Sequence, residues 1–213
     1  MGGAFITFEG TEGSGKSTQI ALFSDYLASQ GRKVMLTREP GGTLIGDQIR
    51  KVLLDPANRT LDATAELLLY AASRAQHLKE VIRPARDAGK IVLCDRFSDA
   101  TLAYQGYGRG LDREMIRTLD RMVTGGMRPD LTLLLDIDTT AGLERAHGRN
   151  SSSGLEGEAR FENEDAAFHT RVRQGYLALA AEEPDRIRVV DASRPPDQVQ
   201  KAIREIVDEM LGT

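Results

Sequence analysis

Residues 8–18 of the chain read FEGTEGSGKST. Within them, Gly10 is followed after four residues by Gly15-Lys16-Ser17, which is the spacing of a phosphate-binding loop. An apolar run typical of a strand precedes the loop at residues 4–8, and a helical repeat follows it at residues 19–27. Strand, glycine-rich turn and helix is the context that the motif requires. A glycine turn that merely opens an ordinary helix is therefore the weaker interpretation.

The residue types of this loop suit a bound phosphate. Glycines let successive backbone N–H groups turn toward an anion without a Cβ in the way. The helix that begins near Lys16 directs the positive end of its dipole at the same anion. Lys16 can reach the terminal phosphates of a nucleotide, and the Ser17 hydroxyl is a suitable Mg²⁺ ligand. The predicted ATP and phosphate contacts are Gly10, Thr11, Glu12, Gly13, Ser14, Gly15, Lys16, Ser17 and Thr18.

Length and composition are those of an ordinary globular protein. The chain has 213 residues, of which 40% are hydrophobic and 28% charged, and this size suits a single domain over residues 1–213. A net charge of -4 argues against a dedicated nucleic-acid binder. No apolar run is long enough to span a membrane and no secretory signal is apparent, so we expect a cytoplasmic protein. Cys94 has no partner for an internal disulfide, and His77, His147 and His169 lack metal-ligand spacing, so surface or packing positions are expected for the histidines.

Apolar runs alternate with helical repeats along the whole chain. Strands are predicted at residues 4–8, 33–38, 90–95, 130–136 and 186–190. After the helix that begins near Lys16, helices are predicted at residues 46–53, 62–88, 98–105, 112–124, 139–147, 164–181 and 195–211. The alternation predicts an α/β protein with the three-layer phosphate-loop NTPase fold, in which helices cover both faces of a five-stranded parallel sheet. A polar stretch at about 148–160 predicts a mobile lid.

An open α/β sheet binds its ligands at the carboxyl ends of its strands. Two of the predicted strands end in an acid, at Asp95 and at Asp136. Either acid suits the role of holding Mg²⁺ through water. We favour Asp95, because Arg96 beside it can hold a phosphate while Asp95 faces the metal. Asp136 is then an acid that caps the following turn.

Tyr70 and Arg74 lie four residues apart and therefore share one face of a predicted helix. Arg74 falls on an otherwise apolar stripe, where an unpaired charge is costly. Two interpretations remain open. Tyr70 can stack on a nucleobase while Arg74 donates a hydrogen bond to it. Alternatively, Arg74 forms a structural salt bridge with an acid elsewhere in the chain and Tyr70 belongs to the core.

Arginines are frequent in and after the predicted lid. A lid arginine can close over transferring phosphates and neutralise the charge that develops in the transition state. Arg145, Arg149 and Arg160 belong to this stretch. Arg171 and Arg173 follow in the next predicted helix, where a solvated charged surface is the expectation.

Several separated motifs resemble those of the thymidylate kinases, the nucleoside monophosphate kinases that phosphorylate dTMP. The motifs are FEG with the phosphate loop at 8–18, TREPGGT at 37–43, ASR at 72–74, CDRF at 94–97 and LAYQGYGRG at 102–110. They extend over nearly the whole chain, and the REPGG and AYQG segments are far more specific than the phosphate loop. The resemblance implies the reaction ATP + dTMP → ADP + dTDP with Mg²⁺. It also implies a homodimer packed through helices.

The resemblance further implies which residues hold the acceptor. Glu12 would approach the sugar 3′-hydroxyl of dTMP, and Arg50 and Arg96 would hold its phosphate. Tyr70 would stack on thymine, in place of the phenylalanine usual in the family, and Arg74 would bond a thymine carbonyl. The base edge and the sugar 2′ position would be met by Thr101, Gln105 and Tyr104.

The phosphate loop has no arginine at residues 11–14, where some members of the family carry a catalytic one. The resemblance therefore implies that the lid supplies this arginine, with Arg160 as the first candidate and Arg149 as the second. Lys16 and Arg96 complete the predicted catalytic set. Two rival functions remain: a kinase of the same fold that acts on another nucleotide or a deoxynucleoside, and a phosphate-loop switch ATPase.

Overall fold

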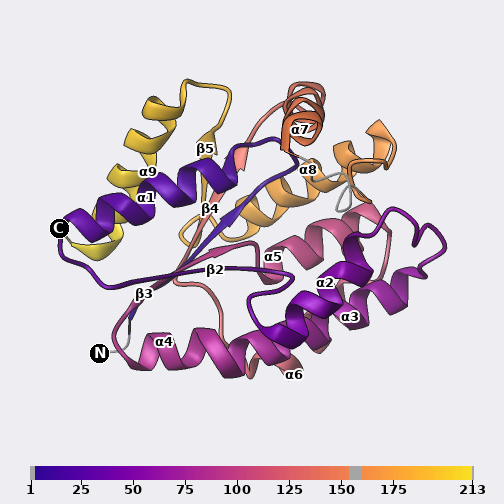
Figure 1. Ribbon diagram of the computed structural model, residues 1–213, viewed down its shortest axis with the longest axis horizontal. Coiled ribbons are helices and arrows are strands. Elements are labelled where there is room, and N and C mark those ends of the chain that lie inside the picture. Colours follow the sequence, from indigo (N-terminus) through magenta and orange to yellow (C-terminus); the bar gives the residue numbers. More distant parts are fainter. Residues whose placement is uncertain (1–2, 154–159, 213) are drawn as a thin grey trace.

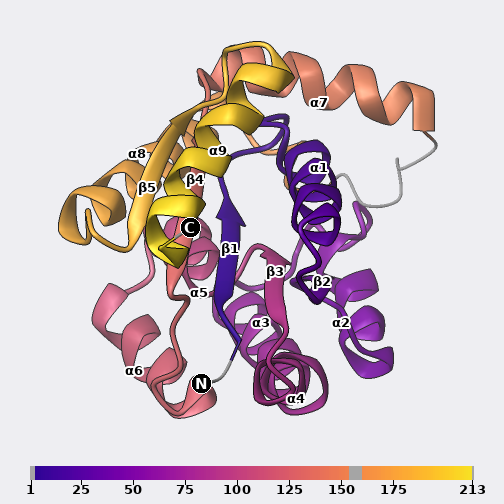
Figure 2. The ribbon, with the colours of Figure 1, turned by 90° about the vertical axis from the view of Figure 1, so that its left-hand side faces the viewer.

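A five-stranded parallel sheet organises the computed structural model, which describes residues 3–153 and 160–212. The strands are β1 (Phe5–Glu9), β2 (Val34–Arg38), β3 (Ile91–Asp95), β4 (Leu131–Asp136) and β5 (Ile187–Asp191). They lie in the order β2-β3-β1-β4-β5, and every neighbouring pair is parallel. The predicted sheet is thus confirmed, and the order places β1, with the phosphate loop after it, at the centre (Figure 2).

Helices cover both faces of this sheet, as Figure 1 shows. The helices are α1 (Lys16–Ser29), α2 (Leu44–Leu54), α3 (Ala63–His77), α4 (Arg83–Asp87), α5 (Ser98–Thr101), α6 (Arg113–Thr124), α7 (Thr139–Ser153), α8 (Ala166–Glu182) and α9 (Pro196–Leu211). A π-helical segment, η1 (Leu78–Ile82), joins α3 to α4, and a second, η2 (Leu102–Gly108), continues α5. No helix in these parts of the chain is both long and apolar enough to cross a membrane.

The alternation of side chains along the strands produces a separate core on each face of the sheet. On one face, Phe8 of β1 packs with Phe23 of α1 and Ile203 of α9. On the other face, Phe5 of β1 packs with Ile82 of η1. All of these side chains are fully buried, and each contributes roughly 2 kcal/mol of hydrophobic stabilisation. The sheet is thereby held between two helical layers.

The structure departs from the prediction in three helices. The helix predicted over 98–105 becomes π-helical after Thr101 and continues to Gly108. The long helix predicted over 62–88 runs continuously but contains η1 in its middle. The helix predicted to end at residue 147 continues as α7 to Ser153, so the first part of the predicted lid is helical. A single glycine such as Gly148 costs a helix only about 1 kcal/mol relative to alanine and does not by itself end it. The rest of the predicted lid, residues 154–159, lies outside the described part of the chain.

The strand register gathers the predicted ligand-binding segments at one edge of the sheet. Phe8 of β1 pairs with Asp95 of β3, and Asp95 pairs on its other side with Arg38 of β2. Since these strands are parallel, the segments that follow them leave the sheet side by side. The phosphate loop, Arg96 and the Glu39–Gly42 segment therefore meet in one place.

Candidate active site

The phosphate loop requires its glycines because of close backbone approaches. Gly10 and Gly13 have φ angles of 139° and 69°, which other residues rarely adopt. A Cβ on Gly10 would lie 2.4 Å from the Leu135 carbonyl oxygen of β4. A Cβ on Gly13 would lie 1.9 Å from the Gly142 carbonyl oxygen of α7. The loop therefore packs directly against β4 and α7.

The ammonium group of Lys16 lies inside this loop. Its Nζ donates hydrogen bonds to the carbonyl oxygens of Gly10 (3.0 Å) and Thr11 (2.8 Å) and to Ser14 Oγ (3.3 Å). Burial lowers the pKa of Lys16 to about 8, and the positive charge of Arg96 acts in the same direction. A phosphate group placed in the loop would supply the negative charge that favours the ammonium form.

Ser17 and Asp95 come together at the mouth of the loop. Ser17 Oγ donates to Asp95 Oδ2 over 3.3 Å, from the first turn of α1 to the end of β3. Hydroxyl and carboxylate oxygens are the ligands that Mg²⁺ prefers, and a nucleotide's phosphates would complete the set. Asp136 is held instead by Arg173, whose Nε and Nη2 donate to it over 2.7 and 2.9 Å. This placement supports Asp95 over Asp136 as the acid beside the metal.

Arg96 is the only non-glycine residue in the described ranges with a positive φ, of 70°. This conformation turns its guanidinium back toward the phosphate loop. Nη1 donates to the Gly10 carbonyl oxygen (2.9 Å) and to the Tyr176 hydroxyl (3.0 Å), and Nη2 donates to Glu12 Oε1 over 3.3 Å. The guanidinium also lies over the ring of Tyr104, 4.9 Å from its centroid. Positive φ in a non-glycine residue persists only where surrounding contacts enforce it, and such residues cluster at active sites.

A cavity of about 430 Å³ joins the phosphate loop to the predicted acceptor site. This volume suits a nucleotide-sized ligand. Donor-side residues in its lining are Gly13, Gly15, Lys16, Ser17, Thr18 and Asp95. Acceptor-side residues in its lining are Glu12, Arg50, Tyr70, Arg74, Arg96, Thr101, Tyr104 and Gln105. The structure therefore brings every residue predicted for the acceptor into one space that opens onto the phosphate loop.

Arg74 is both paired and directed at this cavity. Its Nε donates to Glu39 Oε2 over 2.8 Å, and its Nη2 donates to Thr101 Oγ1 over 2.9 Å. The salt bridge of the second interpretation is thus present, and Arg74 nevertheless lines the cavity, as the first interpretation requires. Glu39, which the sequence analysis did not single out, also contacts His77 Nδ1 over 2.9 Å. An arginine on an apolar stripe indicates that a buried acid pairs with it, but the sequence does not identify that acid.

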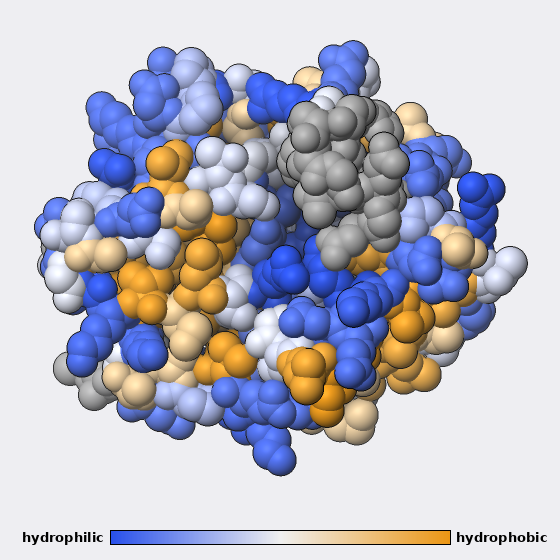
Figure 3. Space-filling model, in the orientation of Figure 1, coloured by the Kyte–Doolittle hydropathy of each residue, from blue (hydrophilic) through white to orange (hydrophobic). Residues whose placement is uncertain are grey.

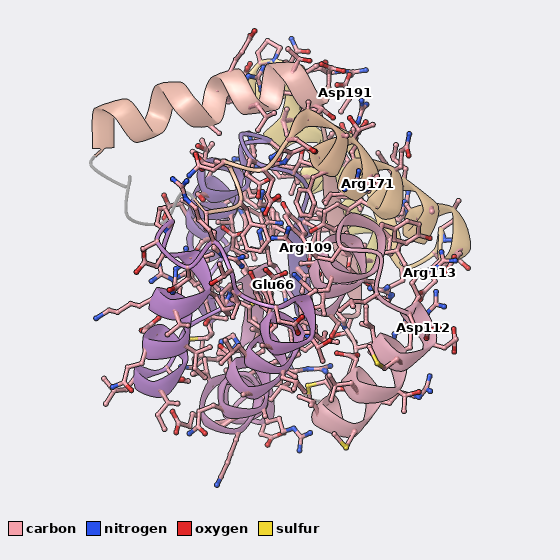
Figure 4. All side chains as sticks on the ribbon, turned by 90° about the vertical axis from the view of Figure 1, so that its right-hand side faces the viewer. Glu66, Arg109, Asp112, Arg113, Arg171 and Asp191 are labelled. Carbon is pink, nitrogen blue, oxygen red and sulfur yellow. The ribbon has the colours of Figure 1, made fainter. Side chains whose placement is uncertain are left out.

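Arg160 does not line the cavity in this structure, although the next two residues, Phe161 and Glu162, do. It is buried, and it bonds the Leu53 carbonyl oxygen and Glu66 Oε2, the latter over 2.5 Å. Glu66 also accepts from Gln105 and Arg109, and Figure 4 shows Glu66 and Arg109 next to each other. The side chain of the second candidate, residue 149, lies outside the described part of the structure.

The two arginines of α8 have specific partners. Arg171 donates from Nε and Nη2 to the Gly108 carbonyl oxygen over 3.2 and 3.1 Å, and Arg173 pairs with Asp136 as described above. Both side chains therefore hold α8 to neighbouring elements rather than forming only a solvated surface. The acceptors, the Gly108 carbonyl oxygen and Asp136, lie 63 and 37 residues away in the chain, so no local pattern indicates them.

Three further buried residues belong to the site. Glu9 accepts hydrogen bonds from the Tyr176 hydroxyl and from the Phe97 N–H, each over 2.7 Å. Burial raises the pKa of Glu9 to about 7, although Arg96 opposes this effect. His169 of α8 is buried with Nδ1 3.3 Å from Glu12 Oε2. The sequence placed Glu9 inside the motif at 8–18 without a role and indicated no partner for His169 or Tyr176.

Comparisons with known proteins agree with this geometry. Residues 8–203 match the protein family described as Thymidylate kinase. The thymidylate kinase of Trichlorobacter lovleyi is 60% identical over 98% of this chain and 98% of its own length. That of Desulfovibrio desulfuricans is 55% identical over 97% of this chain and 96% of its own length.

A solved structure shows the same fold. The crystal structure of thymidylate kinase from Ehrlichia chaffeensis superimposes with a TM-score of 0.77 at 35% sequence identity. The similarity covers 98% of this chain and 99% of that one. With the phosphate loop and the adjoining acceptor cavity in place, these matches over nearly the full length show that the chain belongs to the thymidylate kinase family.

Proposed function

We propose that this protein transfers the terminal phosphoryl group of ATP to dTMP, giving ADP and dTDP. One observation carries the proposal: the phosphate loop and the residues predicted for the acceptor line a single cavity. Membership of the thymidylate kinase family supports the identity of both substrates. Phosphoryl transfer demands mainly that two nucleotides be positioned and that charge be neutralised, which a shared cavity with several cations provides.

On the donor side, the loop amides and Lys16 would bind the phosphates of ATP. Ser17 and Asp95 would hold Mg²⁺ together with those phosphates. Ser17 Oγ and Asp95 Oδ2 lie 3.3 Å from each other, which allows both oxygens to contact one ion or its water ligands. The ion would neutralise charge on the transferring group when it is bound. Lys16 would exchange its hydrogen bonds to Gly10 and Thr11 for phosphate oxygens.

On the acceptor side, Arg96 and Arg50 would hold the dTMP phosphate at the end of the donor. Arg96 is directed toward the phosphate loop by its positive φ, and Arg50 donates to the Pro40 carbonyl oxygen at the cavity wall. Tyr70 would stack on thymine and Arg74 would donate to it. Burial raises the pKa of the Tyr70 hydroxyl above its ordinary value, at which the ring is already neutral near pH 7.

The remaining acceptor contacts follow from the cavity lining. Thr101 and Gln105 would meet the base edge, and Tyr104 would crowd the sugar 2′ position, which favours a deoxyribose. The Tyr104 hydroxyl donates to Glu12 Oε1 over 2.6 Å, so these two side chains would together contact the sugar. Glu12 would accept from the sugar 3′-hydroxyl.

A lid arginine would complete the catalytic set. Arg160 is our first candidate and Arg149 our second. Arg160 would have to exchange Glu66 and the Leu53 carbonyl oxygen for phosphate oxygens when both substrates are bound. Closure of this kind excludes water and so suppresses wasteful hydrolysis of ATP.

We also propose that the protein is a homodimer. Exposed apolar side chains on α2, α3 and α6 support this arrangement, since α3 packs against both α2 and α6 and the three helices form one surface. They are Leu44, Ile45, Val52, Leu68, Met115 and Met122. Figure 3 shows hydrophobic residues at the surface around α2 and α3. Sedimentation velocity of the wild type and of Leu68→Lys tests the proposal, which requires the wild type to sediment as a dimer and the variant as a monomer.

A coupled assay of ADP formation tests the reaction. ADP release should be rapid with dTMP and much slower with dUMP, dCMP, dGMP, dAMP or UMP. Turnover with dTMP no greater than with the purine nucleotides would leave another acceptor as the substrate. ADP release that needs no acceptor at all would instead favour the switch ATPase.

A further inference from the structure

A buried histidine faces the phosphate loop from α8. His169 is 1% exposed, and its ring packs edge-on against Phe168, with the ring centroids 5.5 Å apart. Nδ1 of His169 lies 3.3 Å from Oε2 of Glu12. Three buried atoms here have no hydrogen bond of good geometry within residues 3–153 and 160–212. They are the two ring nitrogens of His169 and Oε2 of Glu12.

Burial of these polar atoms costs free energy unless they form a hydrogen bond with each other. A buried polar group without a partner costs about 1–3 kcal/mol. A residue needed only for packing at this place would be apolar, since the neighbours Phe168 and Val172 are. The two unpartnered groups face each other, and a small rotation of either side chain would bring them into a charge-assisted hydrogen bond.

The two oxygens of the Glu12 carboxylate face different elements of the fold. Oε1 accepts from the Tyr104 hydroxyl of η2 (2.6 Å) and from Arg96 Nη2 after β3 (3.3 Å), and both of these residues line the cavity. Oε2 is the buried end and faces His169. Although burial acts to raise it, the pKa of Glu12 is held well below its usual range by His169, Arg96, Lys16 and Tyr104. Glu12 is thus an ionised, acceptor-only group.

We propose that His169 is a positioning residue that anchors the buried oxygen of Glu12, so that the other oxygen is presented to the sugar hydroxyl of the acceptor nucleotide. The inference rests on the proposed role of Glu12 toward the 3′-hydroxyl of dTMP. Without the anchor, the Glu12 carboxylate rotates about its last torsion, which is a soft one. The acceptor then loses a fixed hydrogen-bond partner while the phosphate loop and Lys16 keep theirs.

The test compares dTMP with its 3′-deoxy analogue, which lacks the hydroxyl in question. His169→Phe keeps an aromatic ring beside Phe168 and removes both nitrogens. We expect it to raise KM for dTMP about tenfold, the size of one hydrogen bond to a charged group. KM for the analogue and for ATP should change less than twofold, and kcat with the analogue should stay close to that of the wild type.

Two polar variants keep the test decisive where His169→Phe folds poorly. The amide nitrogen of His169→Asn falls near the position of Nδ1, and that of His169→Gln falls near Nε2. His169→Asn should therefore restore the KM for dTMP, and His169→Gln should not. Equal losses for dTMP and the analogue, or equal behaviour of the Asn and Gln variants, would overturn the inference.

Glu12→Gln separates this inference from the function on which it rests. Glu12→Gln should reduce the preference for dTMP over the analogue, and combining it with His169→Phe should add little further loss. A normal preference in Glu12→Gln would refute the proposed role of Glu12 and the inference with it. A reduced preference in Glu12→Gln with a normal one in His169→Phe would refute the inference alone.

Discussion

The Tyr176 hydroxyl donates a hydrogen bond to Glu9 Oε2 over 2.7 Å. The same hydroxyl oxygen accepts from Arg96 Nη1 over 3.0 Å, and the other oxygen of Glu9 accepts from the Phe97 N–H over 2.7 Å. Glu9 therefore holds the backbone of Phe97, and Tyr176 holds the guanidinium of Arg96. These contacts enforce the left-handed conformation that turns Arg96 toward the phosphate loop.

Glu9 should make the stability of the protein depend on pH. Its pKa is raised by burial from 4.5 to about 7, so the folded protein binds the proton more tightly than the unfolded chain. The stability contributed by the protonated carboxyl is fully present below pH 4.5 and is lost as the pH rises through about 7. Relative to Glu9→Gln, the free energy of unfolding of the wild type should fall by about 3 kcal/mol over this range.

Urea unfolding of the wild type and of Glu9→Gln at pH 5 and pH 8 measures this difference. Glu183→Gln is a suitable control, because ion pairing with Arg186 lowers the pKa of Glu183 to about 2. The contribution of Glu183 is present above pH 4.5 and is lost only as the pH falls toward 2, so its difference from the wild type should not change between pH 5 and 8. An equally constant difference for Glu9→Gln would contradict the prediction.

Asp95 and Asp136 both end a strand, yet only Asp95 should affect the requirement for Mg²⁺. Asp95 lies 3.3 Å from Ser17 Oγ, whereas Asp136 is neutralised by Arg173. Asp95→Asn should raise the Mg²⁺ concentration for half-maximal activity at least tenfold, since a carboxylate near the ion is lost. Asp136→Asn should leave that concentration unchanged. Titration of kcat with Mg²⁺ at saturating ATP distinguishes them, and similar curves for both variants would remove Asp95 from the metal site.

Arg74→Ala should have two separate effects. The variant leaves Glu39 buried without its main cationic partner, which should lower the free energy of unfolding by about 3 kcal/mol. It should also raise KM for dTMP more than tenfold while KM for ATP changes little, because Arg74 lines only the acceptor side. Glu39→Gln is the matched control, since it weakens the same ion pair but keeps the guanidinium. If both variants raised the two KM values alike, Arg74 would be a structural residue only.

The parts of this protein that could be predicted from its sequence are those encoded locally. The strand at residues 4–8, the glycine pattern and the following helix are neighbours in the chain, so periodicity and turn chemistry predict them together. The rule that ligands lie at the carboxyl ends of parallel strands then led to Asp95 and Arg96. Strand register confirms that these residues leave the sheet beside the phosphate loop.

The partners of buried charges could not be predicted in this way. Glu39 is 35 residues from Arg74, and Tyr176 is 167 residues from Glu9, so no local pattern connects them. A charged residue on an apolar stripe of a helix needs a buried partner. Only the packing of α3 and α8 against the sheet decides which residue that partner is. The same limit applied to Arg160, whose position in the chain indicates a lid while its side chain is packed against Glu66.

Arg160 can be tested by separating its two sets of partners. Arg160→Ala should lower kcat by roughly 10³, as expected for an arginine that neutralises a transferring phosphoryl group. It should also lower the free energy of unfolding by about 3 kcal/mol, because Glu66 loses a buried cation. Glu66→Gln weakens the same ion pair but keeps the guanidinium, so it should lose stability and retain a kcat within about threefold of the wild type. Arg149→Ala completes the comparison. If Arg160→Ala and Glu66→Gln lost stability alike with kcat unchanged, while Arg149→Ala lowered kcat, the catalytic role would pass to Arg149, and Arg160 would only hold Glu66 in place.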